Sequence, residues 1–552
     1  MIKNKIAPVL LALILCLCAV MASCGDTDSD TDAGSITSIR LTYEDKVIPA
    51  NTLTVNLSLG TVTFTVDIQP EGSASTDFTI SSSDTDVATA DGLTFTLLAM
   101  GQTTVTITAN SDSIITNAVT LNVLEEASVK PYNITNNFAQ DSSTGLMVLW
   151  HNDSSLPIQA LQIVAEAGSF DNARTIFVPG IGFETSGDVG TFLLRNIFKT
   201  EVNGLSPGAR YKYRMGSIGA WSDEFIHVTS GGANKDFSFT VISDPQNDTY
   251  PETNSNGTMI ATMNAAIAYD EDNRFFINCG DLTERIGNTV TSTGKSEIVN
   301  YTEAANRYNT KTPIAATQGN HDAYYSGSGT EINWDEATVF NAFVTFPDNG
   351  FEPGKNPDKS KSYYFYYNNV LFIMLNTIAS IYDNTDEKAQ WLEQVLKNDK
   401  DNNLSKYRIV ATHIGAFGNH YYENGNIVKM RSLYGKIFTD YDVDIVFSGH
   451  DHTYSRSNPM KLGENTAITE IDFGPTNGGT IFNIAGATGP KTYNTATGEI
   501  TYLDQVFPVN TKTGIIPGFF VNVKVTADIL TVTARRMGSQ TDFDMYFVEA
   551  KR

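Results

Sequence analysis

The sequence is poor in basic residues, in cysteine and in histidine. Its 552 residues contain 37 Lys and Arg against 62 Asp and Glu, which gives a formal net charge of -25. This balance disfavours a nucleic-acid-binding surface and a polybasic membrane-binding surface, because both need clustered positive charge. Hydrophobic residues make up 41% of the chain, and the length predicts roughly three to five domains with cores of their own. The seven histidines are so few that their positions are informative.

Only one long apolar run occurs, and it lies at the N-terminus. Two lysines, an apolar stretch over 6–21 and the small pair Ala22-Ser23 precede Cys24, which is typical of a signal peptide over residues 1–23. Residues 21–24 resemble the lipobox of bacterial lipoproteins, and the acidic tether over 24–34 resembles the surface-export signals of Bacteroidetes lipoproteins. The resemblance implies lipidation at Cys24 and an exported, surface-exposed protein anchored in the outer membrane. An ordinary signal peptide with an incidental cysteine is the alternative.

The cysteines of such an exported chain offer no disulfide. Cys16 and Cys18 lie within the predicted signal peptide, Cys24 would carry lipid, and Cys279 would then stand alone. Each domain must therefore be stabilised by its own buried core.

Two β-rich modules are predicted before residue 232. Short alternating runs separated by Gly, Asp, Asn and Ser occupy residues 35–126 and resemble bacterial immunoglobulin-like domains. Residues 129–231 resemble a fibronectin type III domain, because the Pro207-Gly208 turn leads into a Tyr-x-Tyr strand. Together with the following Trp221-Ser222-Asp223-Glu224-Phe225, they resemble the N-terminal β-sandwich of purple acid phosphatases. We expect His151 and His227, which lie beside strand patterns, to be surface or packing residues.

The remainder, residues 235–552, has a different pattern. Apolar strand-like runs alternate with predicted helices over 258–270, 386–400 and 430–441, which favours an α/β domain. A hairpin over 362–377, turning at Asn368-Asn369, indicates mixed sheets. The predicted fold class is therefore multidomain, with two N-terminal β-sandwiches followed by an α/β domain with mixed β-sheets.

Five strand-like runs of this domain end in residue types that bind metals. In chain order, the runs are followed by Asp244, Gly280-Asp281, Gly319-Asn320-His321-Asp322, His413 and Gly449-His450-Asp451-His452. Ligands of open α/β sheets bind beyond the carboxyl ends of the strands, so all five groups can converge on one rim. Each fragment alone is a weak signal. The ordered set resembles the calcineurin-like metallophosphoesterase family, and the preceding sandwich narrows the resemblance to the purple acid phosphatase branch.

The resemblance implies a centre of two divalent or trivalent metal ions, which would be Zn, Mn or Fe. One ion would be held by Asp244, Asp281 and His452, and the other by Asp281, Asn320, His413 and His450. Asp281 would bridge the two ions, and a hydroxide shared between them would attack phosphorus. The implied function is hydrolysis of small phosphate esters, with phosphomonoesters favoured.

Three more residues receive roles from the same resemblance. His321 would act as general acid or stabilise the transition state, and Asp322 would orient it through a hydrogen bond. His420, in a His-Tyr-x-Glu loop, would contact the phosphate or the leaving group. A solvated or capping Asp322 and a plain loop His420 are the alternatives.

Two positions depart from the family pattern. Purple acid phosphatases carry a metal-binding tyrosine three residues after the bridging Asp, and this chain has Glu284 there, so no tyrosinate colour is expected. Many relatives carry histidine two residues after the first Asp, where this chain has Gln246. The amide oxygen of Gln246 is a possible metal ligand but a weaker donor than imidazole, so we expect a looser first metal site.

Two other functions compete with a phosphomonoesterase. One is a phosphodiesterase on the same scaffold, and the other is a non-catalytic surface-binding protein with a degenerate phosphatase domain. The complete set of ligand positions favours an enzyme. The segment over 323–361, with Tyr324, Tyr325 and Trp334, is either an aromatic lid over the substrate or a surface insertion.

Overall fold

The computed structural model describes most of the chain after the N-terminal segment. The described residues are 36–70, 78–153, 156–185, 192–232, 235–246, 255–284, 286, 297–323, 338–351, 362–378, 387–463, 471–472, 479–509 and 518–550. The predicted signal peptide, acidic tether and Cys24 lie outside these ranges, as do Tyr324, Tyr325 and Trp334. Within these ranges no helix is both long and apolar enough to cross a membrane.

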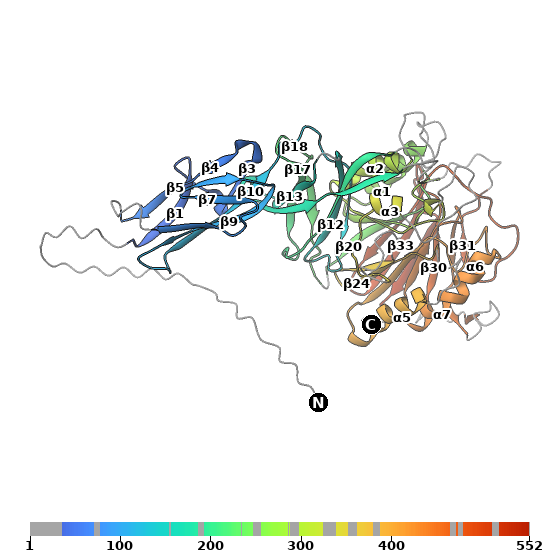
Figure 1. Ribbon diagram of the computed structural model, residues 1–552. Helices are drawn as coiled ribbons and strands as arrows, with labels where there is room; N and C mark the ends of the chain where they lie inside the picture. Colours follow the sequence, from blue (N-terminus) through green and yellow to red (C-terminus); the bar gives the residue numbers. More distant parts are fainter. Residues whose placement is uncertain are drawn as a thin grey trace, which may run out of the picture.

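The first module contains sheets with the strand orders β2-β1-β5, β3-β10-β9-β6 and β4-β8-β7 (Figure 1). Its strands are β1 (Ser38–Tyr43), β2 (Lys46–Val47), β3 (Thr52–Asn56), β4 (Thr61–Thr63), β5 (Thr65–Gln69), β6 (Phe78–Ser82), β7 (Ala88–Asp91), β8 (Thr94–Leu97), β9 (Gly101–Ala109) and β10 (Thr116–Leu124). In β9 the buried side chains are Thr103, Val105, Ile107 and Ala109, so every second residue faces the core. The alternation seen in the sequence therefore forms the core face of this module.

The second module contains one sheet of order β11-β12-β16-β15 and one of order β14-β13-β17-β18, with β19 paired to β17. Its strands are β11 (Tyr132–Phe138), β12 (Leu146–Asp153), β13 (Ile158–Ala165), β14 (Arg174–Pro179), β15 (Ile181–Thr185), β16 (Phe192–Val202), β17 (Arg210–Ser217), β18 (Ala220–Trp221) and β19 (Phe225–Val228). Trp150 and Phe198 stack with their ring centroids 5.4 Å apart in the core of this module. The two β-rich modules predicted before residue 232 are confirmed.

The third part contains two large mixed sheets. One has the order β22-β21-β20-β32-β33-β34 and the other β23-β24-β25-β26-β30-β27-β31. The strands are β20 (Phe237–Ile242), β21 (Asn273–Asn278), β22 (Ile314–Ala316), β23 (Tyr363–Tyr367), β24 (Val370–Leu375), β25 (Tyr407–Thr412), β26 (Ile445–Ser448), β27 (Tyr454–Ser457), β30 (Ile481–Ala485), β31 (Leu503–Val506), β32 (Phe519–Val525), β33 (Ile529–Arg536) and β34 (Asp544–Glu549). The neighbouring strands β20, β21 and β22 run parallel in the first sheet, and β24, β25 and β26 run parallel in the second. Antiparallel pairs, such as β23 with β24 and β32 with β33, extend the two sheets. The β23–β24 hairpin turns at Asn368-Asn369, as predicted.

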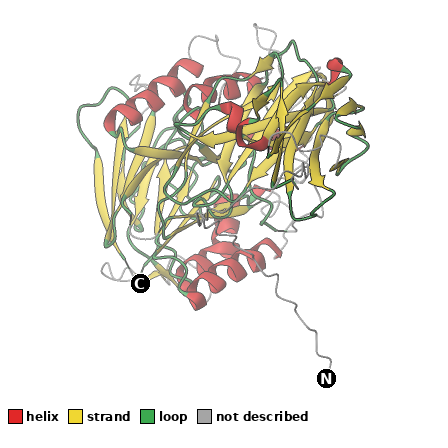
Figure 2. Cartoon of the chain, turned by 90° about the vertical axis from the view of Figure 1, so that its left-hand side faces the viewer, coloured by secondary structure: helices red, strands yellow, loops and turns green. Residues whose placement is uncertain are grey.

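Helices cover the outer faces of the two sheets (Figure 2). They are α1 (Ser255–Tyr269), α2 (Glu297–Asn309), α3 (Thr338–Phe343), α5 (Glu387–Asn402), α6 (Gly425–Met430) and α7 (Lys436–Asp440), with a π-helical turn over Arg431–Gly435. The predicted helix over 430–441 begins too late. Asn424 caps the helix by accepting a hydrogen bond from the backbone N–H of Asn426 at 2.9 Å, so the helical stretch starts at Gly425.

Alternate residues of β24 belong to two different cores. Leu371, Ile373 and Leu375 pack in the cluster that includes side chains of α5 and α7. Phe372 and Met374 pack instead in the cluster that includes the six-stranded sheet. Because both faces are covered, the central strands read as continuous apolar runs rather than as alternating ones.

The second module shares the larger of these two cores with the third part. Phe138 of β11 lies with its ring centroid 5.1 Å from that of Phe275 and 5.2 Å from that of Phe365. The Asn137 amide donates to the Thr345 carbonyl and to the Tyr363 hydroxyl, both at 3.0 Å. This buried interface fixes the sandwich directly against the α/β domain.

His151 lies in the same interface and is a packing residue. Its Nε2–H donates to the Ala342 carbonyl at 2.6 Å, and its Nδ1 accepts from the Asn133 amide at 3.3 Å. These partners suit the neutral ring, and burial lowers the pKa of His151 to about 3.

This neutral histidine predicts a loss of stability in acid. An unfolded histidine takes up its proton near pH 6.5, whereas folded His151 resists protonation down to about pH 3, so stability falls as the pH drops through this window. Between pH 7 and pH 4 the free energy of unfolding should fall by about 3 kcal/mol from this residue. Urea unfolding with chelator present, on wild type and His151→Gln at both pH values, measures it. Parallel pH profiles for the two proteins would contradict the prediction.

Candidate metal centre

The five predicted groups lie at the carboxyl ends of five parallel strands. Asp244, Asp281 and Asn320 follow β20, β21 and β22 of one sheet, whereas His413 follows β25 of the other sheet. His450 and His452 follow β26 of that second sheet. Since the two sheets are stacked, these strand ends form one shared rim on which side chains of both sheets meet.

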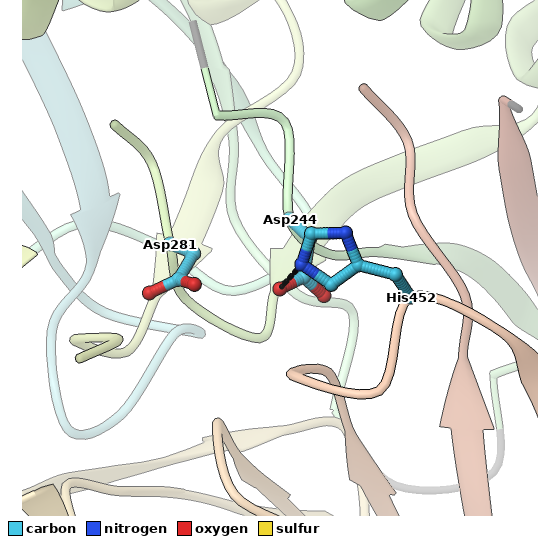
Figure 3. Close-up of side chains that lie close together, drawn as sticks. All are labelled: Asp244, Asp281 and His452. Atoms are coloured by element: carbon cyan, nitrogen blue, oxygen red, sulfur yellow. Dashed lines mark ion pairs between the residues drawn. The ribbon is translucent and has the colours of Figure 1, made fainter. Parts of the chain in front are cut away.

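The first group of donors consists of Asp244, Asp281 and His452 (Figure 3). One ligand atom of each residue lies within 4.8 Å of the others, and all three residues are buried. His452 Nε2 is 3.2 Å from Asp244 Oδ1, while His452 Nδ1 donates to the Lys491 carbonyl at 3.0 Å. The Lys491 carbonyl therefore fixes the tautomer that leaves Nε2 free to bind a metal.

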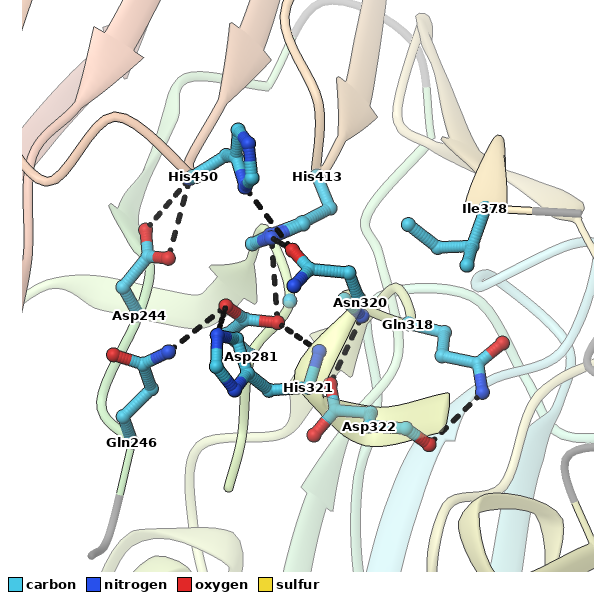
Figure 4. A network of polar contacts seen from close by, with 12 residues as sticks. Asp244, Gln246, Asp281, Gln318, Asn320, His321, Asp322, Ile378, His413 and His450 are labelled. Carbon is cyan, nitrogen blue, oxygen red and sulfur yellow. Dashed lines mark hydrogen bonds and ion pairs between the residues drawn. The ribbon is translucent and has the colours of Figure 1, made fainter. Parts of the chain in front are cut away.

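The second group of donors surrounds the Asn320 amide oxygen (Figure 4). This oxygen lies 2.9 Å from His413 Nε2 and 3.0 Å from His450 Nδ1. His413 Nε2 is 3.3 Å from Asp281 Oδ1, and His413 Nδ1 donates to the Cys279 carbonyl at 2.9 Å. Asp281 therefore belongs to both groups of donors.

Gln246 lies beside Asp281 with one half of its amide hydrogen-bonded. Its Nε2 donates to Asp281 Oδ2 at 2.9 Å. Its Oε1 is buried and has no hydrogen-bond partner among the described residues. Burying an amide oxygen without a hydrogen-bond donor costs about 1–3 kcal/mol of stability. A cation bound next to this oxygen would offset that cost.

The backbone of the site is strained. Asp244, Gln246, Asp281, His450 and His452 all have positive φ values, of 49°, 35°, 53°, 67° and 53°. Residues other than glycine adopt such angles at a cost of order 1–3 kcal/mol each, and they cluster at functional sites.

Two motif glycines allow the close approach of neighbouring segments. A Cβ on Gly319 would overlap the Asp281 carboxylate, and a Cβ on Gly449 would overlap Ser243 and Asp244. The glycines that precede Asn320 and His450 are therefore required by space rather than by backbone angle.

Buried negative charge dominates the electrostatics. Burial opposes the charged forms of both Asp281 and His413, but their attraction outweighs it, so the pKa of Asp281 is well below its usual range. The pKa of His413 rises to about 9 for the same reason, with Asp281 and Asp244 as the neighbouring charges. Burial, with the neighbouring His413, lowers the pKa of His450 to about 3, so this ring stays neutral and can donate a lone pair.

His321 lies at the edge of the candidate metal centre, and a backbone carbonyl fixes the orientation of its ring. Its Nδ1–H donates to the Glu284 carbonyl at 2.8 Å, and its backbone N–H donates to Asp281 Oδ1 at 2.9 Å. The side chain is 20% exposed, and Nε2 is 4.0 Å from Asp281 Oδ2. Nε2 is therefore the ring atom that faces the metal-binding groups.

Asp322 is brought to the site, but its contacts differ from the predicted ones. Its carboxylate accepts hydrogen bonds from the backbone N–H groups of Leu282 and Thr283 at 3.1 Å and of Gly319 at 2.9 Å. Burial, with the nearby Asp281 charge, raises its pKa to about 7. The prediction that Asp322 orients the His321 ring is wrong for Nδ1, because the Glu284 carbonyl takes that position, and Asp322 instead ties the two ligand loops together.

His420 lies on the rim beside the donors. Its Nδ1 hydrogen-bonds the Asn494 carbonyl at 2.7 Å, and its backbone N–H donates to Asp451 Oδ2 at 2.9 Å. Its ring centroid is 4.5 Å from that of Tyr421 and 4.9 Å from that of Tyr493. The Asp451 carboxylate also accepts from the backbone N–H groups of the adjacent loop residues, so the metal motif itself anchors the His420 loop.

Four residues that contact the candidate site received no role from the sequence: Asp451, Glu284, Lys491 and Tyr493. Lys491 Nζ pairs with the Glu284 carboxylate at 2.9 Å, and Tyr493 stacks on His452 with ring centroids 4.4 Å apart. Asp451 could have been found as the middle residue of its His-x-His motif. Lys491 and Tyr493 follow β30 in a loop without any metal-binding pattern.

Comparisons with known families identify two parts of the chain. Residues 237–454 match the family model of the calcineurin-like phosphoesterases, and residues 37–118 match that of the bacterial Ig-like domains, group 2. Purple acid phosphatase 23 of Arabidopsis thaliana is 25% identical over 289 residues, which cover 47% of this chain and 57% of that protein. The chain thus spans little more than half the length of this relative. Purple acid phosphatase 15 of the same plant is 25% identical over 150 residues, which are 27% of this chain and 26% of the relative.

Solved structures agree at the level of the fold. The purple acid phosphatase PPD1 from yellow lupin (Lupinus luteus) seeds superposes with a TM-score of 0.59 at 15% identity, covering 93% of this chain and 96% of that chain. PhoD superposes with a TM-score of 0.50 at 13% identity, covering 77% and 90%. Residues 237–454 are therefore a calcineurin-like phosphoesterase domain, preceded by a bacterial Ig-like domain at residues 37–118.

Proposed function

We propose that this chain is a metal-dependent phosphoesterase that hydrolyses small phosphate esters, with monoesters favoured over diesters, at a centre of two metal ions. The observation that carries the proposal is the position of Asp281, which lies within reach of Asp244 and His452 on one side and of His413 on the other. Purple acid phosphatases among the relatives support the same reaction class.

The donors fit divalent or trivalent ions of the Zn, Mn or Fe type. They combine imidazole nitrogens with carboxylate and amide oxygens, and two of the imidazoles are oriented by backbone carbonyls. When bound, two such ions would polarise the phosphoryl oxygens and lower the pKa of a water molecule. Asp244 and Asp281 bring the negative charge that offsets these ions in a buried place.

His321 is placed to move a proton at the leaving oxygen. Because Nδ1 is held by the Glu284 carbonyl, the proton that can be given away is the one on Nε2. His420 is held at Nδ1 in the same manner by the Asn494 carbonyl, so in the protonated ring its Nε2–H is left to donate to phosphate. Two such donors suit a monoester dianion, which carries more charge than a diester, and this favours monoesters.

Chelation and paired esters test the function. We expect metal-dependent hydrolysis of p-nitrophenyl phosphate, a lower rate with bis(p-nitrophenyl) phosphate, loss of both activities in chelator and recovery with Zn or Mn. A higher kcat/KM for the bis ester would instead establish a phosphodiesterase. If protein shown to hold two metal ions hydrolyses neither ester, the alternative of a non-catalytic binding protein is favoured instead.

The His321→Ala variant tests the proton donor. Loss of a general acid lowers kcat by about 10²–10⁴-fold, and the metal content should stay unchanged because His321 is outside both donor groups. Turnover of p-nitrophenyl phosphate and metal analysis of the same sample provide the two measurements. His420→Ala is the matched control, for which we expect mainly a raised KM. Near-normal kcat in His321→Ala would remove its assigned role.

The Gln246→His variant tests the first donor group. Imidazole binds these metals more strongly than an amide, so the weaker of the two metal dissociation constants should fall by about tenfold or more. Competition with a chromogenic chelator measures this constant without any substrate. Gln505→His, at an exposed position of β31, controls for the added histidine. Equal dissociation constants in wild type and Gln246→His would place Gln246 outside the metal site.

A further inference from the structure

The loop after β30 contacts two histidines of the site directly and reaches a third through Glu284. The Lys491 carbonyl accepts from His452 Nδ1 at 3.0 Å, and the Asn494 carbonyl accepts from His420 Nδ1 at 2.7 Å. The Lys491 side chain pairs with Glu284, whose carbonyl holds His321. Residues 491–494 therefore contact His452, His420 and Glu284, and the carbonyl of Glu284 accepts the hydrogen bond from His321.

Tyr493 lies between two of these histidines. Its ring stacks on His452 at 4.4 Å between centroids and an interplanar angle of 29°, and on His420 at 4.9 Å and 21°. Tyr421 meets the same ring edge-on at 5.6 Å, and Tyr421 also lies over His450 with centroids 5.0 Å apart. Such stacked and edge-on pairs are favourable beyond the burial of their area.

Stacking and the carbonyl hydrogen bonds restrain different motions of each ring. A hydrogen bond to Nδ1 sets which edge of the imidazole faces the site, but it leaves the ring free to tilt about the bond. A stacked neighbour removes the tilt. Because the two carbonyls and the stacked ring belong to one segment of four residues, His420 and His452 are restrained together rather than separately.

The segment is itself fastened to the first donor loop. Thr488 N–H donates to the Ser243 carbonyl at 2.7 Å, and Gly489 N–H donates to the Asp244 carbonyl at 3.2 Å. A Cβ on Gly489 would overlap the Pro245 carbonyl. The path of residues 488–494 is therefore set by the loop that carries Asp244.

We propose that Tyr493 is a positioning residue that couples the first metal site to the phosphate-binding rim by holding His452 and His420 at once. This inference rests on the proposed function, since it assigns a metal to His452 and phosphate to His420. It predicts that one substitution weakens two kinds of binding, whereas a residue that served only one histidine would affect only one.

Tyr493→Leu removes the ring at similar volume, and Tyr493→Phe keeps it. In Tyr493→Leu we expect the weaker Zn dissociation constant to rise about 10–100-fold, as for other groups that orient metal ligands, and the dissociation constant of inorganic phosphate to rise several-fold. Tyr493→Phe should stay within about twofold of wild type in both. Chelator competition measures Zn, and calorimetry on the metal-loaded protein measures phosphate.

The control is Tyr441→Leu, because Tyr441 lies at the end of α7, where its hydroxyl donates to Glu393. Thermal unfolding of the metal-free variants shows whether Tyr493→Leu is folded, and Tyr493→Met supplies a flexible side chain without a ring if it is not. Unchanged constants in Tyr493→Leu, or a change in only one of the two, would overturn the coupling. Neither readout needs turnover, so an inactive wild type would refute the proposed function and leave this test intact.

Discussion

The burial of the Asp281 carboxylate is the constraint on which the rest of the site depends. This side chain is 1% exposed and lies close to the buried Asp244 and Asp322. A buried charge is tolerated only when it is paired and hydrogen-bonded. His413, the Gln246 amide and the backbone N–H of His321 supply those partners from three separate segments. The loops that carry the donors are therefore assembled around one negative group.

Strain in these loops requires support from a rigid surrounding. Five residues of the site hold positive φ angles, and loops that cost this much persist only when the strands beneath them are fixed. The cluster of Phe138, Phe239, Phe275, Phe365 and Phe372 provides that support, with ring centroids 5.0 to 6.0 Å apart in the pairs that contact. Because Phe138 comes from the second module, this sandwich is part of the framework of the site.

The sequence could predict the site residues that lie near the end of a strand, but few of the contacts that join separate loops. Asp244, Asp281, Asn320, His413, His450 and His452 each lie within a few residues of the end of an apolar run, so the rule for α/β sheets was enough to bring them together. Asp322 was misread because its neighbour in sequence is His321, while its carboxylate accepts from backbone N–H groups of another loop. Lys491 acts partly through its carbonyl, which any residue has, so its identity carried no signal for that role.

Glu284 shows how the departure from the family pattern changes the site. In the purple acid phosphatases that the sequence resembles, a metal-binding tyrosine is expected at this position, whereas here the side chain pairs with Lys491 and the carbonyl orients His321. An aromatic ring nevertheless lies against the first donor group, because Tyr493 stacks on His452 from a different loop. Its hydroxyl hydrogen-bonds Tyr421, and burial with this neighbour raises the pKa of Tyr493, so the ring remains a neutral phenol. Under the proposed function, the ring would act by packing on a metal ligand, and Asp244 and Asp281 would supply the negative charge beside the ions.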